Sequence, residues 1–325
     1  MATDRLQVIY RHLSFPKFAI NPTSGTSLNT QLFEDDFRYT LNNPLLSYEQ
    51  RKFYEENGYI VIPKLIEDEL LDECSRRFAD YCNGVIPKGG ITMMKDISLM
   101  KKGAQGEFLY NKLQDILYDS VFEKYFFHPK LLEYVSCFTG PNIKGMHSML
   151  INKPPDSGAL TSRHPLHQDL YYFPFRPADR IVASWTAMER ITESNGCLVV
   201  LPGTHKGELQ PHDYPKWEGG VNKAYHGILG YDDYPTVPLH MEKGDTVFFH
   251  PLLIHGSGAN RTKGFRKAIS CHFSTADYYF IDVKGTIQEG IAKEIEEMAI
   301  KKGFPVTIEE IWDLRSRLVK GEIDV

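Results

Sequence analysis

The chain has 325 residues, which suffices for one large domain or two small ones. Hydrophobic residues make up 42% of it and aromatic residues 12%, so it can bury a sizeable core and is not mostly disordered. The formal net charge of −5 argues against a nucleic-acid partner, which requires a basic excess, and no apolar run approaches the roughly 18 residues of a membrane span.

The N-terminus carries the pattern of a targeting signal. Residues 5–13 read Arg-Leu-Gln-Val-Ile-Tyr-Arg-His-Leu, and this R-L-x5-H-L spacing matches the N-terminal nonapeptide that a peroxisomal import receptor binds. On a helix, Leu6, Ile9 and Leu13 would form an apolar stripe, so the alternative is a short amphipathic helix that docks on the domain. No hydrophobic core of a secretory signal is present, which excludes secretion.

The part of the chain before residue 143 is predicted to be mainly helical. Ser47 and Gln50 have the spacing of a capping box that opens a helix, and Gly58 is a typical residue to end it. A polar, less regular region that includes Lys112 is predicted to be a loop. The elements predicted here are a helix to residue 57, a strand over 59–63, a helix over 66–82, and a helical stretch over 120–139 interrupted at Pro129.

From residue 143 onward the apolar residues recur with a period of two. Short strands of this kind, separated by Gly, Pro and Asn, predict an all-β core with flanking helices, in which the strands form a closed or double sheet. The strands are predicted over 146–151, 181–188, 197–201, 246–249 and 266–273, a long loop of functional type over 203–236, and two C-terminal helices over 288–302 and 307–320.

His167 and Asp169 are the first candidates for a metal site. On a strand, residues i and i+2 point to the same face, so this imidazole and carboxylate can reach one ion. A set of two histidines and one carboxylate on one face of a metal, with open positions opposite, is typical of non-haem Fe(II) oxygenases. The pair is a weak signal alone and requires a second histidine.

Two histidines compete for that place, His250 and His255, and each precedes an arginine by eleven residues. Arg261 lies in a polar turn that should face water, whereas Arg266 opens a strand whose side chains alternate into the core. A buried arginine needs a carboxylate partner, and a dicarboxylate co-substrate would supply one through two parallel hydrogen bonds. The pair of His255 and Arg266 is therefore favoured, and His250 is predicted to be structural.

Several long segments resemble the phytanoyl-CoA dioxygenase family, namely 151–158, 162–175, 195–207, 211–222 and 242–272. The resemblance implies a double-stranded β-helix fold (jelly-roll, cupin-like). It also implies an enzyme of fatty-acid α-oxidation that uses Fe(II), 2-oxoglutarate and O₂, with ascorbate as reductant. Such an enzyme hydroxylates C2 of a 3-methyl-branched fatty acyl-CoA and releases succinate and CO₂. The family pattern further implies a removable peroxisomal targeting leader over 1–23 and a single oxygenase domain over 24–325.

The resemblance also assigns individual residues. His167, Asp169 and His255 are implied as iron ligands, and the residues implied in 2-oxoglutarate binding are Arg266, Lys112, Met149, Trp185 and Ser257. Taken without the family, Met149 and Trp185 would be core residues of alternating strands, Lys112 a solvated charge, and Ser257 part of a turn.

Two other classes of function remain open. One is a cupin-like zinc hydrolase, because the same ligand set binds Zn²⁺ in hydrolases; Arg266, placed for a dicarboxylate, speaks against it. The other is a non-catalytic peroxisomal acyl-CoA carrier on the same fold, which has no reason to retain all three ligands. A halogenating relative would replace Asp169 by a small residue, so the carboxylate disfavours that class.

Overall fold

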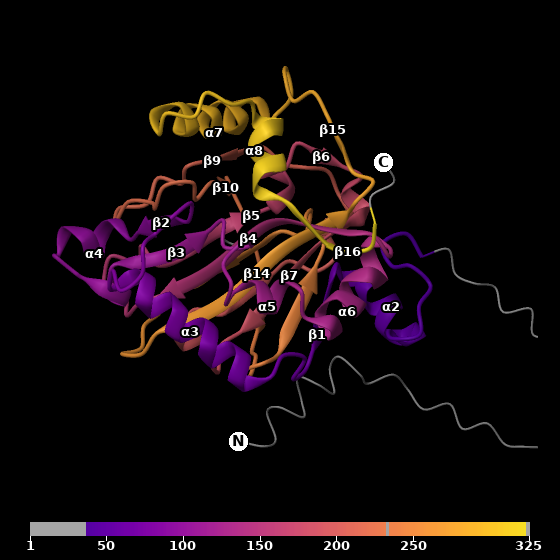
Figure 1. Cartoon of the computed structure of the whole chain (residues 1–325), viewed down its shortest axis with the longest axis horizontal. Coiled ribbons are helices and arrows are strands. Elements are labelled where there is room, and N and C mark those ends of the chain that lie inside the picture. Colours follow the sequence, from indigo (N-terminus) through magenta and orange to yellow (C-terminus); the bar gives the residue numbers. More distant parts are fainter. Residues whose placement is uncertain (1–36, 232–233, 323–325) are drawn as a thin grey trace, which may run out of the picture. The chain divides into compact units, whose positions relative to one another are not determined.

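The computed structural model describes residues 37–231 and 234–322. Two antiparallel sheets form the centre of this part of the chain (Figure 1). The larger sheet has the strand order β1 (Tyr59–Ile62), β12 (Thr246–Phe249), β7 (Ile181–Ala187), β14 (Arg266–Thr275), β4 (Ile143–Lys153), β3 (Tyr110–Gln114) and β2 (Thr92–Lys95), and β16 (Arg317–Lys320) also pairs with β4. The smaller sheet has the order β11 (Val237–Leu239), β8 (Leu198–Val200), β13 (His255–Ser257) and β5 (His164–His167).

Both faces of the larger sheet are covered, and alternate residues of one strand serve different cores. In β7, Val182 packs with the helices on the outer face, whereas Ala183 and Trp185 belong to the cluster shared with the smaller sheet. In β12, Phe248 points to the helices and its two neighbours point to the smaller sheet. Every residue of β7, β12 and β14 is buried as a result. The predicted double sheet of the jelly-roll type is confirmed.

Three helices cover the outer face of the larger sheet: α3 (Asp68–Cys82), α5 (Glu123–Phe126) and α6 (Pro129–Thr139) (Figure 1). α2 (Tyr48–Asn57) begins with the predicted capping box at Ser47 and ends at Gly58. The short α4 (Ile97–Lys101) follows β2. Pro129 occupies the first turn of α6, where its missing N–H is not needed, so it separates α5 from α6. None of the helices in the described residues is both long and apolar enough to cross a bilayer.

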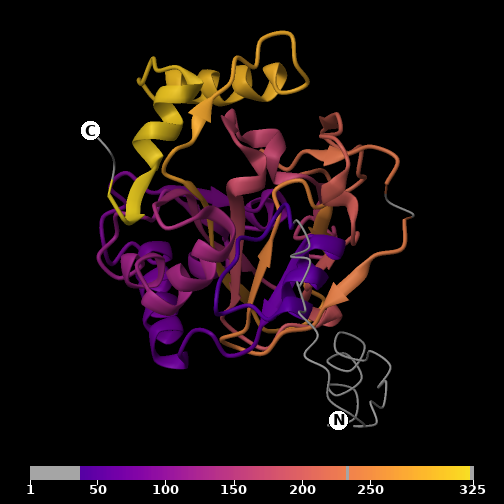
Figure 2. The same cartoon turned by 90° about the vertical axis from the view of Figure 1, so that its right-hand side faces the viewer.

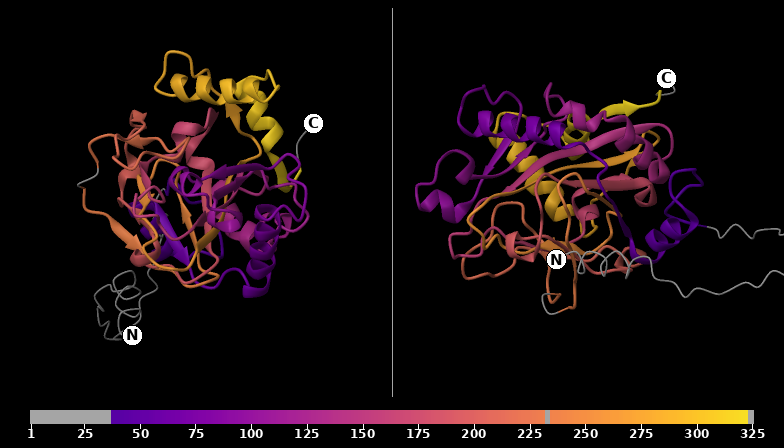
Figure 3. Two further views of the ribbon diagram at one scale, coloured as in Figure 1. Left: turned by 90° about the vertical axis from the view of Figure 1, so that its left-hand side faces the viewer. Right: turned by 90° about the horizontal axis from the view of Figure 1, so that it is seen from below.

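The C-terminal helices α7 (Glu289–Lys301) and α8 (Ile308–Arg315) lie together at one end of the sheets (Figures 2 and 3). They share a core cluster with the segment after β5, where Trp312 of α8 packs against Phe173 and Phe175. The minor strands complete the fold: β6 (Phe175–Arg176) pairs with β15 (Tyr279–Phe280), and β9 (His212–Asp213) pairs with β10 (Gly227–Ile228). α7 and α8 therefore close one side of the region that holds His167 and Asp169.

Three local predictions differ from the structure. Lys112 lies on strand β3 and not on a loop; the strand lacks the apolar alternation because several of its side chains are polar. Asp169 begins a 3-10 helix over Asp169–Tyr172, so it does not continue the strand of His167. The last helix ends at Arg315 and not at Lys320, because the chain becomes extended at Ser316 and pairs along β4 as β16. The targeting leader predicted over 1–23 lies outside the described residues.

Gly58 has no freedom to accept a side chain. Its backbone is left-handed, with φ 79°, and a Cβ would lie 2.5 Å from Nδ1 of the buried His205. The His205 ring is fixed by a contact of 3.1 Å between its Nε2 and the Glu55 carbonyl. We expect Gly58→Ala to lower the free energy of unfolding by about 2–4 kcal/mol, from backbone strain and overpacking together.

Urea unfolding followed by circular dichroism measures this effect, and Gly285→Ala is the matched control. Gly285 has a similar φ of 73° and no heavy atom within 4 Å of the added Cβ, so only the backbone strain of about 1–2 kcal/mol remains. If the two variants lose the same free energy of unfolding, the His205 side chain moves away and accommodates the added methyl group.

Candidate active site

Two strands and a 3-10 helix bring His167, Asp169 and His255 together. His167 ends β5 and His255 begins β13, and the antiparallel register places the two residues directly opposite each other. The Asp169 carboxylate contacts both imidazoles: its Oδ1 is 3.2 Å from His167 Nε2, and its Oδ2 is 3.6 Å from His255 Nε2. The three side chains are buried, and one ligand atom from each lies within 4.8 Å of the others. This spacing fits a single metal ion.

Backbone carbonyls orient both imidazoles. His167 Nδ1 lies 2.9 Å from the Pro165 carbonyl, and His255 Nδ1 lies 2.9 Å from the Leu253 carbonyl. An Nδ1–H that donates to a carbonyl leaves Nε2 deprotonated and free to bind a metal. Burial lowers the pKa of His255 to about 4, which keeps this ring neutral at neutral pH. The carbonyl contacts thus favour, for both histidines, the tautomer that a metal requires.

A third histidine, His272 on β14, holds the carboxylate of Asp169. Its Nε2 lies 2.7 Å from Asp169 Oδ2, and its ring stacks on His147 of β4 at 5.6 Å between centroids. Burial raises the pKa of Asp169, but His255 and His272 outweigh burial and hold that pKa well below its usual value. Asp169 is therefore an ionised carboxylate with a fixed orientation, which suits it to bind a metal ion. His272 was not predicted, although it follows Arg266 by six residues on one strand and so shares its face.

Arg266 is a buried cation without a carboxylate partner. The side chain is 1% exposed, and its Nε and Nη1 have no hydrogen-bond partner among the described residues. Its guanidinium lies over the Trp185 ring, 5.3 Å from the centroid, and burial lowers its pKa to about 10. A buried charge of this kind is costly unless an anion pairs with it. A carboxylate of 2-oxoglutarate would satisfy both nitrogens, so the residues present fit this co-substrate. The competing Arg261 is exposed.

The other residues predicted to bind the co-substrate line the same cavity. Lys112, Met149, Trp185 and Ser257 are all less than 10% exposed and come from four different strands. Burial lowers the pKa of Lys112 to about 8, and its ammonium lies 4.8 Å from the centroid of the Tyr225 ring. The structure thus brings all eight predicted site residues to one cavity, which has a volume of about 870 Å³.

A second buried lysine, which was not predicted, stands beside Arg266. Lys153 of β4 is directly opposite Arg266 in the register of β4 and β14. Its Nζ donates hydrogen bonds to Ser257 Oγ at 2.8 Å and to the Gly258 carbonyl at 2.6 Å. Burial, and then Arg266, hold the pKa of Lys153 well below its usual value. Lys153 Nζ is the donor in this pair, so Ser257 Oγ accepts from it and its own hydrogen is free for another acceptor. The three polar groups Arg266, Lys153 and Ser257 lie together in the cavity and make a candidate anion site.

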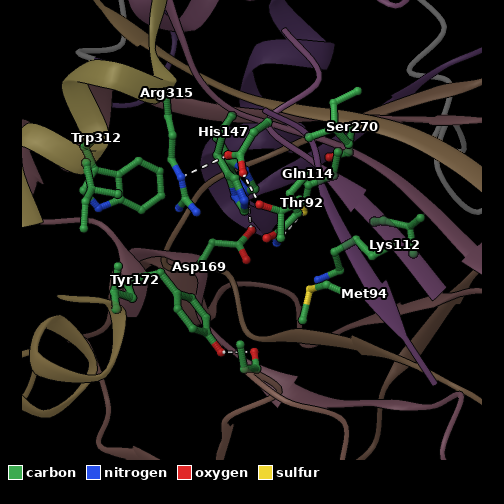
Figure 4. Close-up of a pocket in the computed structure, with 18 of the residues that line it drawn as sticks. Thr92, Met94, Lys112, Gln114, His147, Asp169, Tyr172, Ser270, Trp312 and Arg315 are labelled. Carbon is green, nitrogen blue, oxygen red and sulfur yellow. Dashed lines mark hydrogen bonds and ion pairs between the residues drawn. The ribbon is translucent and has the colours of Figure 1, made fainter. Parts of the chain in front are cut away.

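The cavity continues from the metal ligands to the C-terminal helices. Figure 4 shows Trp312 and Arg315 entering it from α8, with Asp169 between them and Lys112. His147 and Ser270 of the larger sheet also line it. The metal site is thus at the inner part of a large cavity whose outer walls come from α7, α8 and β2.

Comparison with known proteins identifies the family. Residues 54–268 match the model of the phytanoyl-CoA dioxygenase (PhyH) family. The chain is 55% identical to "Phytanoyl-CoA dioxygenase, peroxisomal" of Homo sapiens over 99% of this chain and 97% of the relative. This chain belongs to the phytanoyl-CoA dioxygenase family. A member from Caenorhabditis elegans, named a probable phytanoyl-CoA dioxygenase, is 53% identical over 87% of this chain and 96% of its own length.

Solved structures agree with the fold of this phytanoyl-CoA dioxygenase family member. EctD from S. alaskensis, with 2-oxoglutarate and 5-hydroxyectoine, superposes with a TM-score of 0.57 at 16% identity, over 76% of this chain and 83% of that one. The epimerase SnoN, in complex with Fe³⁺, alpha ketoglutarate and nogalamycin RO, gives a TM-score of 0.55 at 17% identity, over 72% and 85%. These similarities confirm the predicted jelly-roll core.

Proposed function

We propose that the protein is a peroxisomal dioxygenase that uses Fe(II), 2-oxoglutarate and O₂ to hydroxylate C2 of a 3-methyl-branched fatty acyl-CoA such as phytanoyl-CoA. The observation that carries this proposal is the position of the unpaired Arg266 in the same cavity as the cluster of His167, Asp169 and His255. A metal hydrolase needs the three ligands, but its reaction does not require a buried arginine that binds an anionic co-substrate. The 55% identity to peroxisomal phytanoyl-CoA dioxygenase supports both the substrate and the compartment.

In this proposal one group of residues binds the iron and a second group binds 2-oxoglutarate. His167, Asp169 and His255 hold the iron on one side and leave its other side open to the cavity. Arg266 and Ser257 bind the distal carboxylate of 2-oxoglutarate, and Lys112 adds a second positive charge. Met149 and Trp185 exclude water from the reacting atoms. When bound, iron and 2-oxoglutarate supply the oxidising chemistry, in which one atom of O₂ enters the C2–H bond and the other enters succinate as CO₂ is released.

The N-terminal nonapeptide supports the assignment to the peroxisome. Residues 5–13 carry the R-L-x5-H-L pattern that a peroxisomal import receptor binds, and we propose the leader over 1–23 as its ligand. The relatives named peroxisomal include proteins of Homo sapiens, Rattus norvegicus and Mus musculus.

One assay tests the proposed reaction against its alternatives. Purified protein is supplied with Fe(II), 2-oxoglutarate, ascorbate to keep the iron reduced, O₂ and phytanoyl-CoA, and succinate and the acyl product are measured. We expect succinate and 2-hydroxyphytanoyl-CoA in equal amounts. Release of free CoA with Zn²⁺ and without O₂ would instead indicate a hydrolase. Binding of phytanoyl-CoA without succinate would indicate a carrier.

Lys153 provides a separate prediction about the co-substrate. Replacement by methionine removes the donor that orients Ser257, so we expect Lys153→Met to raise KM for 2-oxoglutarate about tenfold. KM for the acyl-CoA should stay within twofold. Ser257→Ala should have an effect of similar size, and the double variant should lose less than the product of the two single effects. Independent, multiplicative effects would show that Lys153 does not act through Ser257.

A further inference from the structure

The cavity is larger than iron and 2-oxoglutarate require. Its volume of about 870 Å³ lies in the upper part of the roughly 300–1,000 Å³ range of pockets that enclose drug-sized ligands. One ion and a five-carbon dicarboxylate fill only a small fraction of this space. The chemical character of the remaining lining residues therefore indicates which kind of organic substrate the cavity binds.

The outer cavity has an apolar wall and a basic rim. The wall consists of side chains from α7 and α8, namely Ile291, Ile295, Met298, Ile311 and Trp312. Directly beyond the ends of these apolar faces stand two cations: Lys302 follows the last residue of α7, and Arg315 ends α8. Lys88 faces the same cavity from the loop before β2. Apolar surface next to cations suits a ligand with a long nonpolar part and an anionic group.

Positive charge is in excess at this rim. Arg315 is paired with Asp115 at 3.0 Å, and Thr92 also donates to that carboxylate. Lys88 and Lys302 have no ion-pair partner among the described residues and are exposed at the mouth. Burial lowers the pKa of Lys302, and although Asp115 opposes this, the cations Arg315, Lys88 and Lys223 lower it further. Three other cations thus lie close enough to act on the charge of Lys302, and Asp115 is the carboxylate that opposes them.

The loop that carries Lys88 adds open backbone to the rim. Gly89 and Gly90 follow Lys88 and also line the cavity, and a Cβ at either position would meet no atom within 4 Å. Gly89 has φ 56°, a conformation typical of glycine. An anion can therefore approach this backbone without meeting a side chain at either glycine.

We infer that Lys88 and Lys302, with Arg315 beside them, bind the phosphate groups of the CoA thioester. This inference rests on the proposed function, which supplies the acyl-CoA. The apolar wall of α7 and α8 lies next to the rim and contacts the nonpolar part of the same substrate. The cations of the rim thus bind the CoA part of the substrate. The metal ligands hold the iron, and Arg266 binds the co-substrate.

The test compares two thioesters of the same acid, phytanoyl-CoA and phytanoyl-pantetheine, which lacks the phosphates. In the Lys88→Gln/Lys302→Gln variant we expect KM for phytanoyl-CoA to rise about tenfold, since each lysine–phosphate contact near the surface contributes a few-fold. KM for the pantetheine thioester should not change. Added salt should raise KM for phytanoyl-CoA in the wild type and much less in the variant. The matched control is Lys52→Gln/Lys206→Gln, which removes two exposed lysines outside the cavity.

An equal KM for phytanoyl-CoA in the wild type and the Lys88→Gln/Lys302→Gln variant would overturn the inference. If the wild type converts neither thioester, the proposed reaction fails, and calorimetry with CoA alone still tests the rim. Weaker CoA binding in the rim variant than in the control variant supports the site, and equal binding overturns it.

Discussion

Asp169→Ala is expected to reduce turnover at least 100-fold while the protein stays folded. Removing a contact one step outside a metal's ligands already costs about 10- to 100-fold, and Asp169 is itself the proposed ligand that neutralises half of the ion's charge. The substitution leaves the Nε2 of His272 without its partner, which costs about 1–3 kcal/mol of stability. Succinate release measures the turnover, and circular dichroism measures the fold.

Metal-dependent stabilisation separates loss of the ion from loss of the fold. At about 100 times its dissociation constant, Fe(II), or Co(II) where air must be tolerated, should stabilise the wild type by about 2.7 kcal/mol. The alanine variant should gain far less. Asp282→Ala, which removes an exposed carboxylate, is the control and should behave like the wild type. Full activity in Asp169→Ala would refute the iron assignment.

Arg266→Met is expected to act in opposite directions on binding and on stability. Without the guanidinium, KM for 2-oxoglutarate should rise at least about 30-fold, which corresponds to about 2 kcal/mol for a charge-assisted bidentate pair. In the absence of ligand, however, the arginine is a buried cation with two unpaired nitrogens. Replacing it by an apolar side chain should raise the free energy of unfolding by about 1–3 kcal/mol.

The matched control is Arg261→Met, five residues earlier on an exposed turn. This substitution should change neither KM for 2-oxoglutarate nor the stability by a measurable amount. KM is obtained from succinate release and stability from urea unfolding of the metal-free protein. If Arg266→Met destabilises the unliganded protein by several kcal/mol, the arginine is a structural residue and its proposed carboxylate partner is wrong.

Local periodicity predicts much of this fold because alternate residues of each strand serve two different cores. The strands around Trp185 and Phe248 are recognisable for that reason, and so is the helix between Ser47 and Gly58, whose capping residues act within one turn. β3 was missed because Lys112 and its polar neighbours hide the apolar alternation. β16 was missed because its strand is defined by pairing with β4, about 170 residues earlier in the chain.

The site likewise combines features that follow from local sequence with features that depend on contacts between distant segments. His167 and Asp169 are close in sequence, and their common direction is a local property, even though Asp169 begins a 3-10 helix. The choice of His255 and Arg266 followed from the need of a buried arginine for a carboxylate partner, and the family resemblance implied the same two residues. The contact of His272 with Asp169 and of Lys153 with Ser257 joins segments that are more than 100 residues apart in the chain and are brought together by the packing of the fold. No local pattern contains that packing, so these two residues became visible only in the structure.

Anaerobic absorption spectroscopy tests most directly whether His167, Asp169, His255 and Arg266 form one site for Fe(II) and 2-oxoglutarate. We predict that 2-oxoglutarate added to the Fe(II)-loaded wild type produces the visible charge-transfer band of the iron chelate. The band should require at least about 30-fold more 2-oxoglutarate in Arg266→Met and should be absent in Asp169→Ala. A wild-type protein that binds Fe(II) but develops no band at any concentration of 2-oxoglutarate would contradict the assignment.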